Sequence, residues 1–152
     1  MNSGRPIILA PGAGAVHNVL GAPYRFLATS AETAGAFALI EGIAPPQSGV
    51  PLHLHTREDE TFFILEGSLE VRCGDSAVTL NKSSMAFLPR NVAHAYRNTS
   101  NMSAKYLVFM TPGGFEKCLE EFARLPAGAP PAPETIVAIG QKYGVQFPAP
   151  AK

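Results

Sequence analysis

The sequence has little charge, little cysteine and no tryptophan. Only 16% of its 152 residues are charged, and twelve basic side chains balance twelve acidic ones. This balance provides no basic surface for nucleic acid or for an anionic membrane. No apolar run is long enough to span a bilayer, and the one near the start is too short for a signal peptide. We therefore expect a cytoplasmic protein whose partner is a small molecule or a second copy of itself.

The two cysteines, Cys73 and Cys118, lack the spacing of a zinc or redox motif. In a chain without an export signal, we expect both to be reduced thiols. Hydrophobic residues make up 46% of the chain, which is enough for one sizeable core. The length suits a single domain over residues 1–152.

Short apolar or alternating runs, separated by turn residues, fill the middle of the chain. This pattern is typical of an antiparallel sandwich or barrel and predicts an all-β fold. Several runs, such as Phe62-Phe63-Ile64-Leu65, are apolar on both faces, so another subunit should cover part of the sheet. We therefore expect a homodimer. The expected strands span residues 24–28, 36–43, 52–55, 61–66, 68–73, 77–80, 85–88, 94–97 and 105–110.

The pattern changes after Thr111, because seven of the fourteen prolines follow it and the apolar residues recur at helical spacing. One short helix should bury Phe115, Cys118, Leu119 and Phe122 and end before Pro126. A second helix is expected over residues 134–143, with Ile136, Val137, Ile139 and Tyr143 on its buried side. This helical extension, at about residues 113–147, is expected to cap the outer face of a sheet rather than to form a mobile lid.

Three histidines and one glutamate have the spacing of a metal site. His53 and His55 alternate along an expected strand, so both side chains point to the same face. Glu60 opens the next strand, and His94 begins a later one. We expect these four residues to bind one divalent transition metal ion. Nitrogen and oxygen donors suit iron, manganese, cobalt, nickel, copper or zinc.

Each of these residues also has an ordinary structural interpretation. A lone histidine is usually a surface or core residue, but three of the four histidines fall in this pattern. His17, the fourth, is expected at the surface or at a pocket rim. Glu58 and Asp59 could compete with Glu60 as the carboxylate ligand, although a solvated turn is the expected place for both.

The residues around these ligands resemble the two cupin motifs. The segment HLHTREDETFFILEG, from His53 to Gly67, resembles the first motif, and PRNVAHAYRN, from Pro89 to Asn98, resembles the second. The resemblance covers about residues 36–111 and implies a double-stranded β-helix, the cupin jelly-roll barrel. It further implies a metal ion on the barrel axis. The run of expected strands extends the barrel core to about residues 24–111. The layout is similar to that of small bacterial single-domain cupins of the quercetin-dioxygenase-like (Cupin_2) type.

Three departures from the motifs fall at glycine positions. Gln47 occupies the leading glycine position of the first motif, Ser83 the opening glycine position of the second, and Asn91 its internal glycine position. Asparagine is the non-glycine residue that best tolerates a left-handed turn, so Asn91 can still form the hairpin. No ligand position is changed.

Four protein ligands would leave one or two positions on the ion for a substrate or dioxygen. The resemblance implies that Glu60 also helps to deprotonate a bound hydroxyl. Strand alternation places Phe62, Ile64 and Tyr96 near the ligands, as an apolar substrate pocket or as ordinary core. The first hypothesis is an oxygenase for a small hydroxylated, enolisable or aromatic compound. A metal-dependent isomerase, lyase or cyclase and a non-catalytic binding protein remain open.

Overall fold

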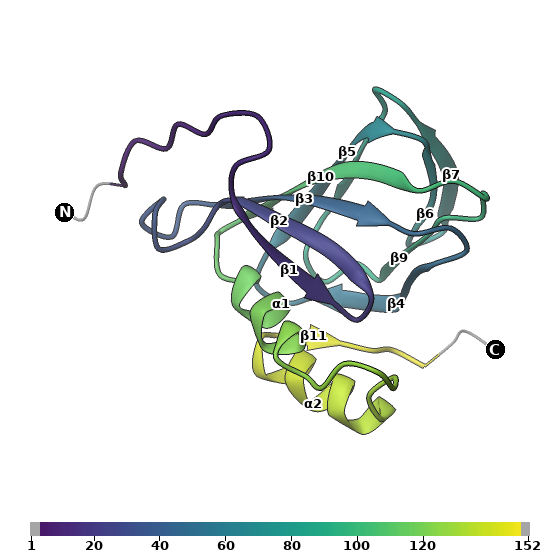
Figure 1. Ribbon diagram of the computed structural model, residues 1–152. Coiled ribbons are helices and arrows are strands. Elements are labelled where there is room, and N and C mark those ends of the chain that lie inside the picture. The colour runs from purple at the N-terminus through teal and green to yellow at the C-terminus, as the bar shows by residue number, and fades with distance from the viewer. Residues whose placement is uncertain (1–3, 150–152) are drawn as a thin grey trace.

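The computed structural model describes residues 4–149 and shows two antiparallel sheets that face each other as a barrel (Figure 1). Both are built from strands distant in the sequence, as in a double-stranded β-helix. The first has the order β1 (Ala15–Val19), β2 (Ala22–Ala28), β3 (Ala38–Ala44), β10 (Ala104–Thr111), β5 (Asp59–Glu66) and β8 (Met85–Leu88). The second has the order β11 (Val145–Gln146), β4 (Gly49–His55), β9 (His94–Arg97), β6 (Ser68–Cys73) and β7 (Ser76–Asn81).

The structure confirms the all-β prediction and contains all nine expected strands. Two further strands, β1 and β11, were not predicted. β1 forms a hairpin with β2, and β11 pairs with β4 over only two residues. Both lie at the edge of a sheet. Their sequences are short and expose much of their length, so they lack the apolar pattern by which a strand is detected.

The two helices, α1 (Glu116–Ala123) and α2 (Pro133–Lys142), lie across one end of the barrel (Figure 1). We expected them on the outer face of a sheet, and this prediction is wrong. Phe115, Leu119 and Phe122 pack into the interior, and Ile139 is the most buried apolar side chain of α2. The amphipathic pattern shows that one face of a helix is buried, but not which surface covers it. Neither helix is long and apolar enough to cross a membrane.

Apolar side chains also cover part of the outer face of the six-stranded sheet. Phe63, Met85, Phe87 and Phe109 are each at least 38% exposed and lie on the neighbouring strands β10, β5 and β8. Phe63 is the cross-strand partner of Met85, so both belong to the same face. An exposed apolar face of this kind is typical of a protein–protein contact. The homodimer stays a prediction.

The three positions where the motifs have glycine all adopt left-handed backbone conformations. Gln47 has a φ of 57°, Ser83 of 68° and Asn91 of 64°. The local fold of the motifs is therefore kept although glycine is absent. A non-glycine residue in this region costs about 1 to 2 kcal/mol, because Cβ approaches the following carbonyl oxygen. Gln47 offsets part of this cost, since its amide donates hydrogen bonds to the carbonyl oxygens of Thr99 and Ser100.

Replacing Ser83 by glycine should therefore stabilise the protein. The residue is exposed, and its backbone N–H, which donates to the carbonyl of Ile64, would be unchanged. We expect S83G to raise the free energy of unfolding by about 1 kcal/mol in urea denaturation, because left-handed strain is removed. Q47G should gain less, because it also loses two hydrogen bonds. A destabilised S83G would show that the left-handed turn is not strained.

Candidate metal centre

Four side chains that can bind a metal ion converge inside the barrel. His53 and His55 lie on β4, and His94 lies on β9 as the cross-strand partner of His53. Glu60 reaches the same point from β5, in the opposite sheet. One ligand atom of each residue lies within 4.8 Å of the others, and all four residues are buried. The structure thus brings together all four residues that the sequence spacing indicates.

Backbone carbonyls orient two of the histidine rings. His53 Nδ1 lies 2.8 Å from the carbonyl oxygen of Pro51, and His94 Nδ1 lies 3.0 Å from that of Val92. An Nδ1–H group that donates to a carbonyl leaves the lone pair on Nε2. The Nε2 atoms of both rings are therefore the ones available to a metal ion.

The remaining polar atoms of the group fit a shared ion. His94 Nε2 and Glu60 Oε2 lie 3.0 Å apart, but neither atom has a partner with hydrogen-bond geometry. His55 Nε2 lies 3.7 Å from the same oxygen. A buried polar atom without a partner costs about 1 to 3 kcal/mol. A divalent transition metal bound by three imidazoles and one carboxylate would satisfy these atoms, so the residues could hold such an ion.

Burial and mutual charge set the protonation of this group. Burial lowers the pKa of His55 to about 4 and also lowers the pKa of His53. Burial alone would raise the pKa of Glu60, but the three histidines outweigh it and lower this pKa. Burial alone would lower the pKa of His94, whereas the Glu60 carboxylate raises it. At neutral pH, Glu60 is therefore an anion and His53 and His55 are neutral, the forms that bind metal.

We expect Glu58 in a solvated turn from the sequence, and this prediction is wrong because the side chain is buried. Only 4% of the residue is exposed, and its Oε2 lies 3.8 Å from His55 Nδ1. Neither atom has a hydrogen-bond partner, whereas His53 and His94 have carbonyls at this position. Burial raises the pKa of Glu58 to about 7, against the charge of Arg57. Its three-residue spacing from His55 is the one sequence signal for this contact, and that spacing also suits a turn.

Asp59 and His17 lie outside the group of ligands. Both side-chain oxygens of Asp59 accept hydrogen bonds from the Arg90 guanidinium, at 2.8 and 3.0 Å. Together with the Arg90 backbone N–H, this pairing lowers the pKa of Asp59 to about 2. His17 is half-buried on β1, where its ring centroid lies 4.5 Å from that of Phe26.

A cavity of about 450 Å³ lies beside the four ligands and includes three of them in its wall. Most of the wall is apolar or aromatic, with contributions from both sheets and both helices. Of the three expected pocket residues, Phe62 and Tyr96 line this cavity. Ile64 is fully buried in the core and is not among the lining residues. Other lining residues, which were not expected in the pocket, are Tyr24, Tyr106, Val108, Met110, Phe115, Leu119, Phe122 and Phe147.

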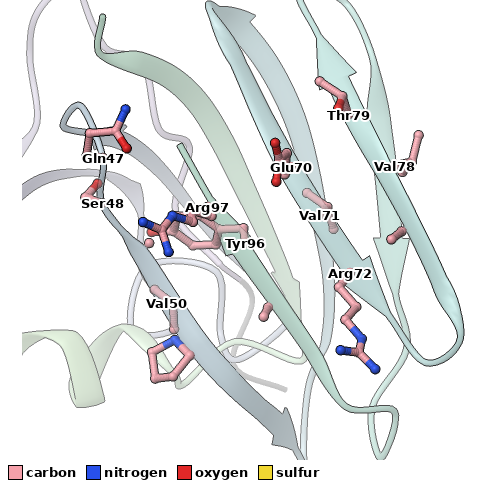
Figure 2. Close-up of a pocket in the computed structure, with 14 residues that line it drawn as sticks. Gln47, Ser48, Val50, Glu70, Val71, Arg72, Val78, Thr79, Tyr96 and Arg97 are labelled. Atoms are coloured by element: carbon pink, nitrogen blue, oxygen red, sulfur yellow. The ribbon is translucent and has the colours of Figure 1, made fainter. Parts of the chain in front are cut away.

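A second and more open hollow, of about 660 Å³, lies outside the barrel against the five-stranded sheet (Figure 2). Its wall comes from β4, β9, β6 and β7 and includes the exposed side chains of Glu70, Arg72 and Arg97. None of the four candidate ligands lines it. The inner cavity is therefore the candidate site, although it is the smaller of the two.

Comparisons with known proteins agree with this geometry. A cupin domain model matches residues 40–110, which contain all four candidate ligands. Quercetin 2,3-dioxygenase of Bacillus subtilis is 29% identical over 93 residues, which are 61% of this chain and 27% of that protein. An RmlC-like cupin from Shewanella frigidimarina superposes with a TM-score of 0.62 at 13% identity, covering 72% of this chain and 93% of that one. The chain belongs to the cupin superfamily.

The curated relatives of this cupin carry different names. The tetracenomycin polyketide synthase protein TcmJ of Streptomyces glaucescens is 32% identical over 80 residues, which are 53% of this chain and 52% of that protein. The cupin thus spans about a quarter to a half of the length of these two relatives. The likeness establishes the family and the barrel, while the reaction has to be inferred from the site.

Glu58 should make the stability of the metal-free cupin depend on pH. Its pKa rises from 4.5 in the unfolded chain to about 7 in the fold, so the folded state binds more protons between these values. Glu58 therefore stabilises the fold below pH 4.5, and this contribution is lost as the pH rises through 7. The E58Q variant has no ionisable group at this position, so its stability does not fall with pH in this way. Relative to the wild type, its free energy of unfolding should increase by about 2 kcal/mol between pH 5 and pH 8.

The neighbouring variant D59N is the matched control. With a pKa of about 2 in the fold and 3.8 as its ordinary value, Asp59 is ionised in both states throughout this pH range. The difference between D59N and the wild type should therefore stay constant from pH 5 to pH 8. Urea denaturation at several pH values measures both differences. A constant difference for E58Q as well would contradict the burial of the Glu58 carboxyl group.

Proposed function

We propose that this cupin is a metal-dependent oxygenase that acts on a small hydroxylated, enolisable or aromatic compound. One observation carries the proposal: three of the four candidate ligands line a largely apolar cavity whose wall includes several aromatic side chains. A cavity of about 450 Å³ is within the range of small-molecule sites. The likeness to a protein named quercetin 2,3-dioxygenase supports the same reaction class.

The ion would supply open coordination positions and would lower the pKa of a substrate hydroxyl bound there. Glu60 is placed to accept the proton of that hydroxyl, because its carboxylate is ionised and faces the cavity. Phe62 and Tyr96 provide aromatic surface next to it, at an interplanar angle of 78° to one another. These rings would orient a flat substrate and exclude water from the reacting atoms.

A second candidate function is an isomerase, lyase or cyclase that uses the same ion without oxygen. The likeness to a protein named tetracenomycin polyketide synthase protein TcmJ favours it, because that name does not describe an oxygenase. Glu60 would again accept a substrate proton, and the aromatic wall would hold the ring system. The two candidates differ in one requirement, which is oxygen.

An oxygen electrode distinguishes these functions. The cupin, loaded separately with each candidate metal, is mixed with quercetin and with a panel of smaller hydroxylated aromatics. We expect oxygen uptake that requires both metal and substrate and that matches the amount of substrate consumed. Turnover under strict anaerobiosis would contradict the oxygenase and support the second candidate. Ligand-dependent stabilisation without product in either atmosphere would indicate a binding protein.

Glu60 and Glu66 give a matched pair of variants on β5. Glu66 is exposed at the end of the strand, where it pairs with Lys105 at 3.6 Å. We expect E60Q to lower the rate of substrate consumption at least about 100-fold, as is typical for the loss of a general base. E66Q should keep the wild-type rate. Full activity in E60Q would contradict the proposed role of this carboxylate.

A further inference from the structure

Three tyrosine hydroxyl groups meet at one point inside the barrel. Tyr96 Oη lies 2.8 Å from Tyr106 Oη and 3.1 Å from Tyr24 Oη. The triangle is closed by a distance of 3.3 Å between Tyr106 Oη and Tyr24 Oη. We call these three residues the tyrosine triad. All three line the same cavity as three of the four candidate metal ligands.

A glycine makes this arrangement possible. Gly42 on β3 is the cross-strand partner of both Tyr24 on β2 and Tyr106 on β10, so all three positions share the inner face. A Cβ atom at Gly42 would lie 2.6 Å from Cζ of Tyr106 and 2.7 Å from its hydroxyl oxygen. The missing side chain therefore leaves the space that the Tyr106 ring occupies. Tyr96 completes the triad from β9 in the opposite sheet.

The hydroxyl groups of the triad stay protonated. Burial raises the pKa of Tyr24, and it raises those of Tyr96 and Tyr106 well above 10. The negative charge of Glu60 also raises the pKa of Tyr24 and Tyr96. The triad therefore acts as a neutral donor and acceptor of hydrogen bonds and not as an acid or base.

The count of donors and acceptors indicates what the triad can bind. Each hydroxyl has one proton and two lone pairs, so a closed ring of three uses all its protons and leaves three lone pairs free. A ligand hydroxyl can donate to such a lone pair. It can also insert between the hydroxyl groups of Tyr24 and Tyr106, which are the farthest apart of the three. There it would accept a hydrogen bond from one tyrosine and donate one to the other.

Tyr96 of the triad and its neighbour Phe62 each follow a candidate metal ligand along the same strand. Phe62, which contacts both Tyr96 and Tyr106, follows Glu60 by two residues, and Tyr96 follows His94 by two residues. Two residues along a strand correspond to about 7 Å. A fused pair of aromatic rings has a comparable length. One flat molecule in the cavity can therefore reach both polar points.

We propose that the tyrosine triad is a second recognition point of the cavity and binds a hydroxyl group at the end of a flat ligand that lies away from the metal ligands. The ligand class is thus a fused-ring aromatic compound with oxygen substituents at both ends. This inference rests on the proposed binding of small aromatic compounds, but it does not require that oxygen be used.

Binding of 2-naphthol and 2,6-dihydroxynaphthalene to the zinc-loaded cupin tests the proposal by calorimetric titration. The second hydroxyl should tighten binding to the wild type about three- to tenfold, as one additional neutral hydrogen bond does. In Y24F this gain should disappear, while 2-naphthol should bind as to the wild type. Tyr24 is the best position because it makes the two longer contacts of the triad. Y106F provides an independent second variant.

Tyr143, the fourth tyrosine, gives the matched control. Its hydroxyl donates to Glu121 at 2.6 Å, and it does not line the cavity. Y143F should keep the full gain. A gain that persists in Y24F and Y106F, or an equal loss of affinity for both compounds, would overturn the proposal and leave the triad a structural role. If 2-naphthol binds but the second hydroxyl adds nothing, this inference fails alone. If neither compound binds the wild type, the proposed substrate class fails with it.

Discussion

Burial of four ionisable side chains between two sheets is the constraint on which this barrel depends. His53, His55 and His94 come from one sheet and Glu60 from the other, and each would be costly to bury alone. The Glu60 carboxylate offsets part of this cost by attracting its neighbours, but several polar atoms still lack a partner. A site of this kind makes the metal-free fold less stable, but it holds the candidate ligands in the positions that an ion requires.

The interior of the barrel changes its chemistry along the strands. The candidate metal ligands and Glu58 form one end, Phe62 forms an aromatic middle, and the tyrosine triad forms a neutral polar end. Both polar ends consist of side chains from the two facing sheets. The same contacts that hold the sheets together therefore also shape the cavity. The helices α1 and α2 lie at one end of the barrel (Figure 1) and contribute side chains to the wall of the cavity.

The sequence was sufficient to predict nine of the eleven strands in the described part of the chain and the convergence of the ligands, because alternation and turn residues are local properties. It did not reveal Tyr24 and Tyr106 as neighbours of Tyr96, since up to 82 residues separate these hydroxyl groups along the chain. Contacts across a barrel depend on register and strand order, which no local pattern contains. Glu58 was misplaced for a related reason: a charged residue in a turn is usually solvated, and only the tertiary fold buries it behind His55.

The central claim is that this group of residues binds a single metal ion. Anomalous diffraction from crystals grown with each candidate metal tests it most directly. The account predicts one anomalous peak per chain, about 2.0 to 2.3 Å from the Nε2 atoms of His53, His55 and His94 and from a Glu60 carboxylate oxygen. Absence of a peak at this point with saturating metal, or a peak held by other residues, would contradict it.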